Sequence, residues 1–73
     1  MLTTEKLAKR LARRLKQLRK ERGLSQETLA AEAGLGRAYY WRLEQGSINV
    51  TLETLVKLSN VLRVDVSDLL SRH

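Results

Sequence analysis

The stretch between Gly23 and Gly46 limits the fold of this chain more than any other feature of its sequence. Two short segments with helical spacing of apolar residues are separated here by a tight turn that contains Gly34. Each segment begins with a capping signal and ends at a glycine, so the two cannot merge into one long helix. The whole chain has no proline and four glycines, which favours helices over loops. We therefore predict an all-α fold in which two short helices meet at a turn, the layout of a helix-turn-helix.

The same signals predict five helices in one compact domain that covers residues 1–73. The expected helices cover residues 4–22, 26–33, 37–45, 52–62 and 66–71, with the helix-turn-helix at about 25–45. Their starts are marked by residues that favour the N-cap position, namely Ser25, Gly36, Thr51 and Asp65. Gly23 suits a left-handed helix stop. A left-handed Arg63 after the fourth helix would cost on the order of 1 kcal/mol.

The residue inventory argues against catalysis and against metal binding. The chain of 73 residues has no cysteine, and its one histidine, His73, is the last residue. Disulfides and thiolate metal sites are therefore excluded, and a buried catalytic imidazole is not expected. We find no Ser/His/Asp set, no phosphate-binding glycine loop and no metal-ligand cluster. We expect no enzyme activity, no cofactor and no metal. Glu27 and Glu32 are read as helix-surface charges.

No membrane or export segment is predicted. No apolar run approaches the roughly 20 residues that span a bilayer, and the N-terminal segment is interrupted by charges. The expected location is the cytoplasm of a bacterium, or of a phage-infected one, in association with the nucleoid.

Positive charge is concentrated in the first 22 residues. The net charge of the chain is +6, and residues 1–22 hold nine lysines and arginines against Glu5 and Glu21. Residues 23–73 hold five basic residues against six acidic ones. A field of this kind attracts polyanions and adds salt-sensitive affinity. Two alternatives are a solvated helix face and a membrane-surface helix, although the apolar stripe of the first helix lacks aromatic residues.

The central segment resembles the phage repressor and Cro-like (XRE) helix-turn-helix family. The residues that carry the resemblance are Leu24-Ser25-Gln26-Glu27-x-Leu29-Ala30-x-x-Ala33-Gly34, then Arg37-x-Tyr39-Tyr40-x-Arg42-Leu43-Glu44-x-Gly46. It covers roughly residues 11–70. It implies a five-helix, lambda-repressor-like DNA-binding domain. The family includes restriction–modification controller proteins of similar size, antitoxins and the DNA-binding domains of longer repressors.

Base-reading residues are expected on one side of the third helix. Helical spacing places Tyr40 and Leu43 toward the core. The opposite side is predicted to read bases, through Arg37, Ala38, Trp41 and Arg42. Arginine pairs bidentately with guanine, so the two arginines are the main candidates, with phosphate contacts as the alternative. Ala38 could meet a thymine methyl group, and Trp41 could contact a sugar, contact a methyl group, or pack against protein.

A second set of residues is predicted to contact phosphates. The set consists of Gln26, Tyr39, Gln45, Ser47 and Asn49. The resemblance implies that Gln26, at the start of the second helix, binds a phosphate and braces the third helix. Half-buried packing is the alternative for Tyr39. The loop over residues 45–49 has no lysine or arginine, unlike many relatives, which weakens its electrostatic contribution.

Two further sets are structural. The resemblance implies that Arg19 of the first helix pairs with Glu44 at the end of the third and fixes its orientation; two unrelated surface charges are the alternative. A dimer interface is expected at Val64, Val66, Leu69 and Leu70. The alternative is that these four side chains complete the core of one chain.

The sequence therefore predicts a sequence-specific, double-stranded-DNA-binding transcription regulator, a repressor or an autoregulator. One recognition helix reads only about four to six base pairs, while a genome offers about 10⁶–10⁹ competing sites. A homodimer on a pseudo-palindromic operator is therefore expected, with no small-molecule effector evident. The alternative function is a protein-interaction module, such as an antitoxin or a factor that bridges to the transcription machinery.

Overall fold

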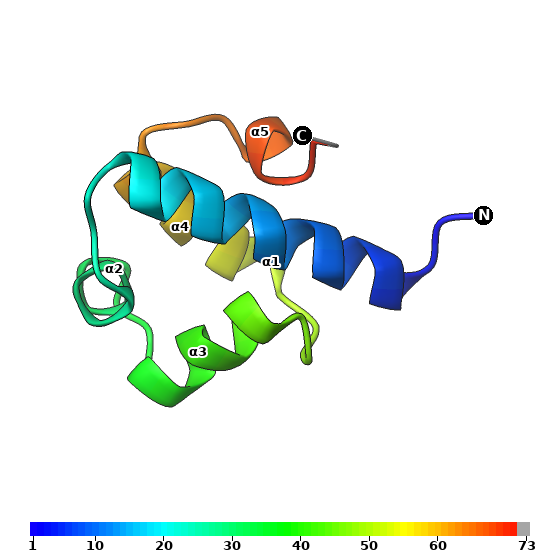
Figure 1. Cartoon of the computed structure of the whole chain (residues 1–73), viewed down its shortest axis with the longest axis horizontal. Coiled ribbons are helices and arrows are strands. Elements are labelled where there is room, and N and C mark those ends of the chain that lie inside the picture. The colour runs from blue at the N-terminus through cyan, green and yellow to red at the C-terminus, as the bar shows by residue number, and fades with distance from the viewer. Residues whose placement is uncertain (72–73) are drawn as a thin grey trace.

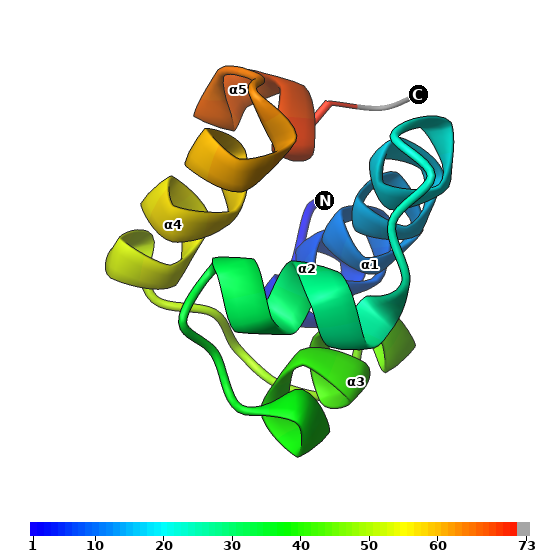
Figure 2. The ribbon, with the colours of Figure 1, turned by 90° about the vertical axis from the view of Figure 1, so that its left-hand side faces the viewer.

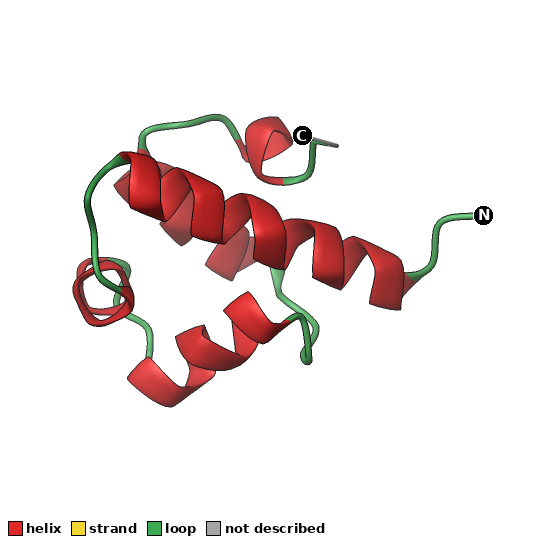
Figure 3. Ribbon diagram, viewed as in Figure 1, coloured by secondary structure: helices red, strands yellow, loops and turns green. Residues whose placement is uncertain are grey.

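The computed structural model describes residues 1–71, and these form five α-helices with no β-strand (Figure 3). The helices are α1 (Thr4–Glu21), α2 (Gln26–Glu32), α3 (Arg37–Gln45), α4 (Leu52–Leu62) and α5 (Val66–Leu69). The predicted all-α class and the number of helices within the described residues are confirmed. The expectation for His73 lies outside these residues.

Three predicted helix ends differ from the structure. The first and second helices stop one residue earlier than expected. The larger difference is α5, which ends at Leu69 instead of residue 71. Leu70 has left the helical conformation, with φ −102° and ψ 5°. Ser71 Oγ then donates a hydrogen bond back to the Asp68 carbonyl at 3.0 Å, so a turn replaces the expected last helical residues.

Side chains cap four of the five helix starts. The predicted caps Ser25, Thr51 and Asp65 are confirmed, since each accepts a hydrogen bond from a backbone N–H in the first turn of its helix. Thr3 caps α1 in the same way, which the capping signals in the sequence did not predict. Asp68 completes a capping box with Asp65. These local bonds fix where four of the helices begin. The fifth, α3, begins after the predicted N-cap Gly36, which has no side chain to accept a hydrogen bond.

Four residues that follow helices have left-handed backbone, namely Gly23, Gly34, Gly46 and Arg63, so the predicted left-handed stop at Gly23 is confirmed. Two of the four bear on packing and strain. Gly46 ends α3 with φ 71°, and a Cβ at this position would lie 3.2 Å from the Cα of Lys9. Glycine is therefore required both for its conformation and for the close approach of α3 to α1. Arg63 ends α4 with φ 57°, the conformation suggested by its position after the helix.

The helices are arranged around α1. Figure 1 shows α1 running through the middle of the molecule, with α3 below it and α5 above it. Figure 2 shows α2 and α3 together at one end, and α4 and α5 on the side away from α1. Arg14 links α1 to the end of α5, because its Nε donates to the Asp68 carbonyl at 2.8 Å. On the other side, α3 packs against α1, and α2 packs against α3.

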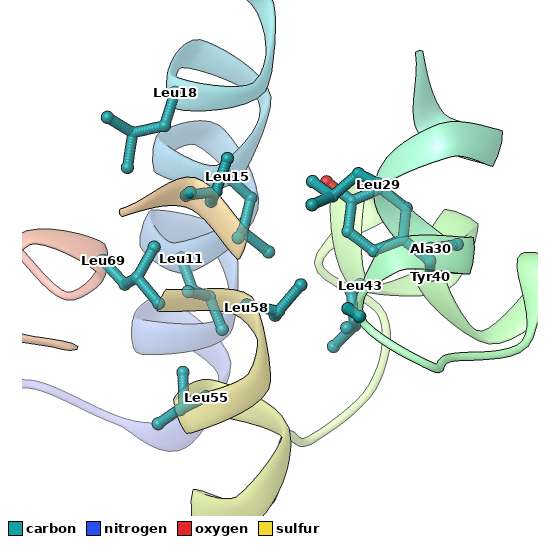
Figure 4. Close-up of a cluster of buried hydrophobic side chains, with 12 residues drawn as sticks. Leu11, Leu15, Leu18, Leu29, Ala30, Tyr40, Leu43, Leu55, Leu58 and Leu69 are labelled. Atoms are coloured by element: carbon teal, nitrogen blue, oxygen red, sulfur yellow. The ribbon is translucent and has the colours of Figure 1, made fainter. Parts of the chain in front are cut away.

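The core consists mainly of leucine side chains from all five helices. In Figure 4, leucines of α1, α4 and α5 face Leu29, Tyr40 and Leu43 of the helix-turn-helix pair. Burial of this apolar surface is the main favourable contribution to folding. One side of α3 is used in this way, which leaves its other side for contact with a partner.

The prediction that Leu69 belongs to a dimer surface is wrong. Its side chain is 0% exposed and belongs to the core cluster of the single chain. The reason is that α5 is a single short turn that lies against α1, so its inward residue is covered completely. Val64, Val66 and Leu70 pack against the core but stay partly exposed. These three can still contribute to an interface.

Replacing Arg63 with glycine should raise the free energy of unfolding by on the order of 0.5–1 kcal/mol. Glycine adopts the left-handed conformation of this position without the strain of a side chain. The matched control is Asn60→Gly, because Asn60 is exposed inside α4 and glycine is unfavourable in a helix interior. Urea unfolding should show a higher free energy of unfolding for Arg63→Gly and a lower one for Asn60→Gly. A destabilised Arg63→Gly would contradict the account of this helix end.

Candidate nucleic-acid interface

The third helix has one face in the core and one face open to solvent. Tyr40 and Leu43 are buried, as predicted. Arg37 and Arg42 are exposed, and Trp41 is 52% exposed. Since Trp41 is absent from the core cluster and its apolar neighbours, packing against the core of this chain does not account for it. The open face therefore combines two cations with a large aromatic side chain.

The predicted base-reading residues gather around one surface hollow. The hollow is lined by Gln26, Arg37, Ala38, Trp41 and Arg42. Four of these come from successive turns of α3 and one comes from the start of α2, so both helices of the pair contribute. The arrangement offers guanidinium donors, an amide and apolar surface side by side. These are the groups that recognise the edges of bases.

The arginine at the start of α3 is held loosely. Arg37 Nη1 lies 3.7 Å from Glu27 Oε2, and both side chains are largely exposed. An ion pair of this kind contributes little to stability, because water and salt screen it. Arg37 is thus free to exchange Glu27 for another partner.

A buried carboxylate fixes the position of α3. Glu44 is 4% exposed, and its two oxygens accept four hydrogen bonds. Arg19 donates from Nε at 2.6 Å and from Nη2 at 3.1 Å. Gln26 Nε2 donates at 3.1 Å and the Tyr40 hydroxyl donates to Oε2. The predicted Arg19–Glu44 pair is therefore present and is a bidentate one.

Arg19 also holds the turn between α1 and α2. Its Nη1 donates to the Leu24 carbonyl at 2.9 Å, so one guanidinium bonds to the turn and to α3 at once. Gln26 closes the ring from the other side, because it begins α2 and bonds to the same carboxylate. The bracing role expected for Gln26 is thus present. Its phosphate contact remains a prediction.

The ionisation of this cluster follows from its contacts. Burial alone raises the pKa of Glu44, but hydrogen bonds from Arg19, Tyr40 and Gln26 outweigh burial and hold the pKa below its usual value. The hydrogen bond to Glu44 raises the pKa of Arg19. Burial, together with the hydrogen bond to Glu44, raises the pKa of the Tyr40 hydroxyl. At neutral pH the cluster is therefore a carboxylate, a guanidinium and a neutral phenol.

Three of the residues predicted to contact phosphates are exposed at the C-terminal end of α3 and in the loop that follows it. Gln45 is the last residue of α3, and Ser47 and Asn49 lie in the loop. Ser47 Oγ donates to the Arg42 carbonyl at 3.3 Å, which keeps the loop close to the helix end. Tyr39 is partly buried and packs against the core, in agreement with the alternative given for it.

Sequence reasoning missed the role of the Tyr40 hydroxyl, because helical spacing accounts only for the position of its ring in the core. The spacing of Tyr40 and Glu44, four residues apart on one helix, places the hydroxyl beside the carboxylate. A buried tyrosine normally finds a partner for its hydroxyl, so this spacing was the available signal.

Metal-binding clusters and membrane-spanning helices were also sought among residues 1–71. Residues 1–71 contain no group of three or more His, Asp or Glu side chains that could hold a metal ion. Among the same residues, no helix is both long and apolar enough to cross a membrane.

Comparison with known proteins gives matches over most of the chain. A family model described as helix-turn-helix, HTH_3, matches residues 15–69. The chain is 46% identical over 63 residues to the control protein C.MunI of a Mycoplasma species, covering 85% of each protein. Its fold is similar to that of the restriction-modification controller protein C.AhdI from Aeromonas hydrophila, with TM-score 0.82, 40% identity and coverage of 85% of this chain and 94% of that one. It is also similar to the biofilm master regulator SinR in complex with DNA, with TM-score 0.80, 39% identity and coverage of 84% and 98%.

Replacing Arg19 with alanine should lower the free energy of unfolding by about 3 kcal/mol, because Glu44 would remain buried without its cation. The matched control is Arg13→Ala, an exposed arginine of the same helix, which should change stability by less than about 0.5 kcal/mol. Chemical unfolding monitored by circular dichroism measures both. Equal stability of the two variants would contradict the role given to the buried pair.

Replacing Glu44 with glutamine should change how stability depends on pH. Since the folded-state pKa of Glu44 is lowered from its usual value of about 4.3, the carboxylate contributes stability that is complete above that pH. This contribution is lost as pH falls through the folded-state pKa. Glu44→Gln should therefore be less stable than the unaltered chain at neutral pH, and the gap should narrow in acid. A gap that stays constant from neutral pH to acid would contradict the assignment.

Proposed function

The chain belongs to the helix-turn-helix family HTH_3, and from this premise we propose that it is a sequence-specific, double-stranded-DNA-binding transcription regulator. The observation that carries the proposal is the exposed face of α3. Arg37, Ala38, Trp41 and Arg42 line one hollow there. The buried Glu44 cluster holds this helix at a fixed orientation to α1 and α2. A rigid helix with an exposed, donor-rich face suits the major groove.

Each residue of this face has a distinct role in the proposal. Arg37 and Arg42 donate bidentately to guanine O6 and N7. Trp41 supplies apolar surface to a thymine methyl group or to a deoxyribose, and Ala38 leaves room for the base edge. The exposed side chains of the two arginines fit this role, because neither is committed to a buried partner.

Phosphate contacts position the helix in the groove. Gln26 keeps one amide hydrogen bond to Glu44 and also lines the hollow with Arg37 and Arg42. On the other flank, Gln45, Ser47 and Asn49 present neutral polar groups to the backbone, and Tyr39 offers its hydroxyl. Such contacts set register without reading sequence.

We place the protein on DNA as a homodimer. The partly exposed Val64, Val66 and Leu70 supply apolar surface for a second copy. Two copies related by a two-fold axis would bind half-sites about one helical turn apart. C.MunI and C.AhdI are control proteins by name, which supports a repressor or autoregulator that acts in the cytoplasm of a bacterium.

Arg37→Ala and Arg42→Ala should each weaken binding to the preferred site by about 1–3 kcal/mol and relax base preference at one position. The matched control is Lys57→Ala on the exposed side of α4, which lies outside the hollow. Titration of fluorescent duplexes that carry single base changes measures both effects. Two arginine variants that keep wild-type affinity and base preference would show that α3 does not read the operator.

Val66→Glu should weaken self-association, because it places a carboxylate in the apolar surface proposed for the second copy. Val66 also packs against the core, so the melting temperature of the variant is measured alongside. The matched control is Val56→Glu, since Val56 is 50% exposed on α4 and lies outside the proposed dimer surface. Analytical ultracentrifugation with and without the operator measures the effect. If Val56→Glu dissociates the dimer and Val66→Glu does not, the interface lies on α4.

A further inference from the structure

The solvent-facing side of α1 carries a row of cations with no role in the fold. We define the α1 basic stripe as Arg13, Lys16 and Lys20, which lie three and four residues apart and therefore on one side of the helix. All three side chains are exposed. The ion pairs within residues 1–71 involve Arg19, Arg37 and Lys57, and none involves the stripe. Its charge is therefore not neutralised by the described part of the chain.

Nearby carboxylates are already engaged. Glu21 accepts a hydrogen bond from Gln17 at 3.3 Å. Glu44 accepts its hydrogen bonds from Arg19, Gln26 and Tyr40. Like charges three or four residues apart on a helix repel each other by a few tenths of a kcal/mol per pair. The stripe thus slightly destabilises the free helix, and an anionic partner would relieve that repulsion.

The position of the stripe indicates which anion it meets. Arg13, Lys16 and Lys20 line a surface hollow together with Gln17 and Glu44. Glu44 belongs to α3, so the stripe borders the C-terminal half of the proposed recognition helix. A duplex that receives α3 would therefore have its backbone next to this side of α1.

The loop after α3 cannot supply the same charge. Residues 45–49 contain no lysine or arginine. The stripe extends over about 10 Å of helix axis, at 1.5 Å per residue. Along one DNA strand the charges are about 3.4 Å apart in axial rise, so a stripe of this length is matched to about three phosphates.

We propose that the α1 basic stripe is a binding site for the phosphate backbone of DNA that flanks the bases read by α3. The proposal rests on the proposed function and adds a second contact region to it. An acidic protein surface is a less suitable partner, because the stripe shares a hollow with Glu44 of α3, the helix that the proposed function places on DNA.

The test compares two triple variants with the same reduction in charge. The first, Arg13→Gln/Lys16→Gln/Lys20→Gln, removes the stripe. The second, Lys6→Gln/Arg10→Gln/Lys57→Gln, removes three cations from elsewhere: two line a separate hollow with Met1 and Leu2, and one lies on α4. Affinity for the duplex site selected from random DNA is measured over a series of salt concentrations. Melting temperatures are measured alongside, and Lys16→Gln alone serves if the first triple variant does not fold.

The stripe variant should show a weaker salt dependence and keep its base preference. The slope of log K against log salt should become shallower by about 0.9 for each phosphate that the stripe no longer neutralises, so by about 2.7 for three. The control variant should keep the wild-type slope. An unchanged slope in the stripe variant, or equal changes of slope in both triple variants, would overturn the proposal. The second outcome would mean that only net charge matters.

Shortening the duplex separates this proposal from the proposed function. Trimming the DNA to the bases defined by selection should weaken wild-type binding and leave the stripe variant unaffected, because the flanking phosphates are gone. Equal effects of trimming on both proteins would overturn the inference and leave the recognition role of α3 intact. A different result is also possible, in which the wild type shows no base preference but its salt dependence still falls when the stripe is removed. That result would overturn the proposed sequence-specific function and retain the stripe as a phosphate-binding site.

Discussion

The position of α3, the proposed recognition helix, depends on one buried carboxylate. Glu44 lies near the end of α3, and its oxygens accept hydrogen bonds from α1, α2 and its own helix. A lone buried carboxylate would be strongly unfavourable, so the donors must be present together with it. The net gain in stability from such a pair can be small, but its geometry is restrictive. Arg19, Gln26 and Tyr40 can all reach Glu44 in one arrangement of the three helices. We regard this cluster as a device that sets orientation more than one that adds stability.

The same cluster explains how a chain of 73 residues can hold the exposed face of α3 at a fixed orientation. The leucine core determines which side of α3 is buried, but apolar packing is not directional. Hydrogen bonds with defined geometry supply the direction. The close approach of Gly46 to Lys9 holds this same C-terminal end of α3 against α1. The open face then holds Arg37, Trp41 and Arg42 where a base edge can meet them, and the cations of α1 lie along the flank.

Much of this architecture could be predicted from the sequence because its signals are local. N-caps, glycine stops and helical spacing act within a few residues, and they located the helices to within one or two residues at each end. The Arg19–Glu44 pair was predicted from the family resemblance. The Tyr40 hydroxyl and the Arg14 contact with the Asp68 carbonyl were not predicted, because they depend on how helices pack. Leu69 was misplaced for the same reason. Its apolar character fits either a core or an interface, and only the position of α5 against α1 decides between them.

The most direct test of the central claim is selection of preferred sites from random duplex DNA at about physiological salt, with binding stoichiometry read on the selected site. The account predicts a two-fold symmetric motif bound by two chains, since one helix held at a fixed orientation reads one half-site. Binding without an enriched motif, which disappears as salt rises, would contradict it. That result would leave the electrostatic attraction of α1 as the basis of DNA binding and would remove α3 as a reader of sequence.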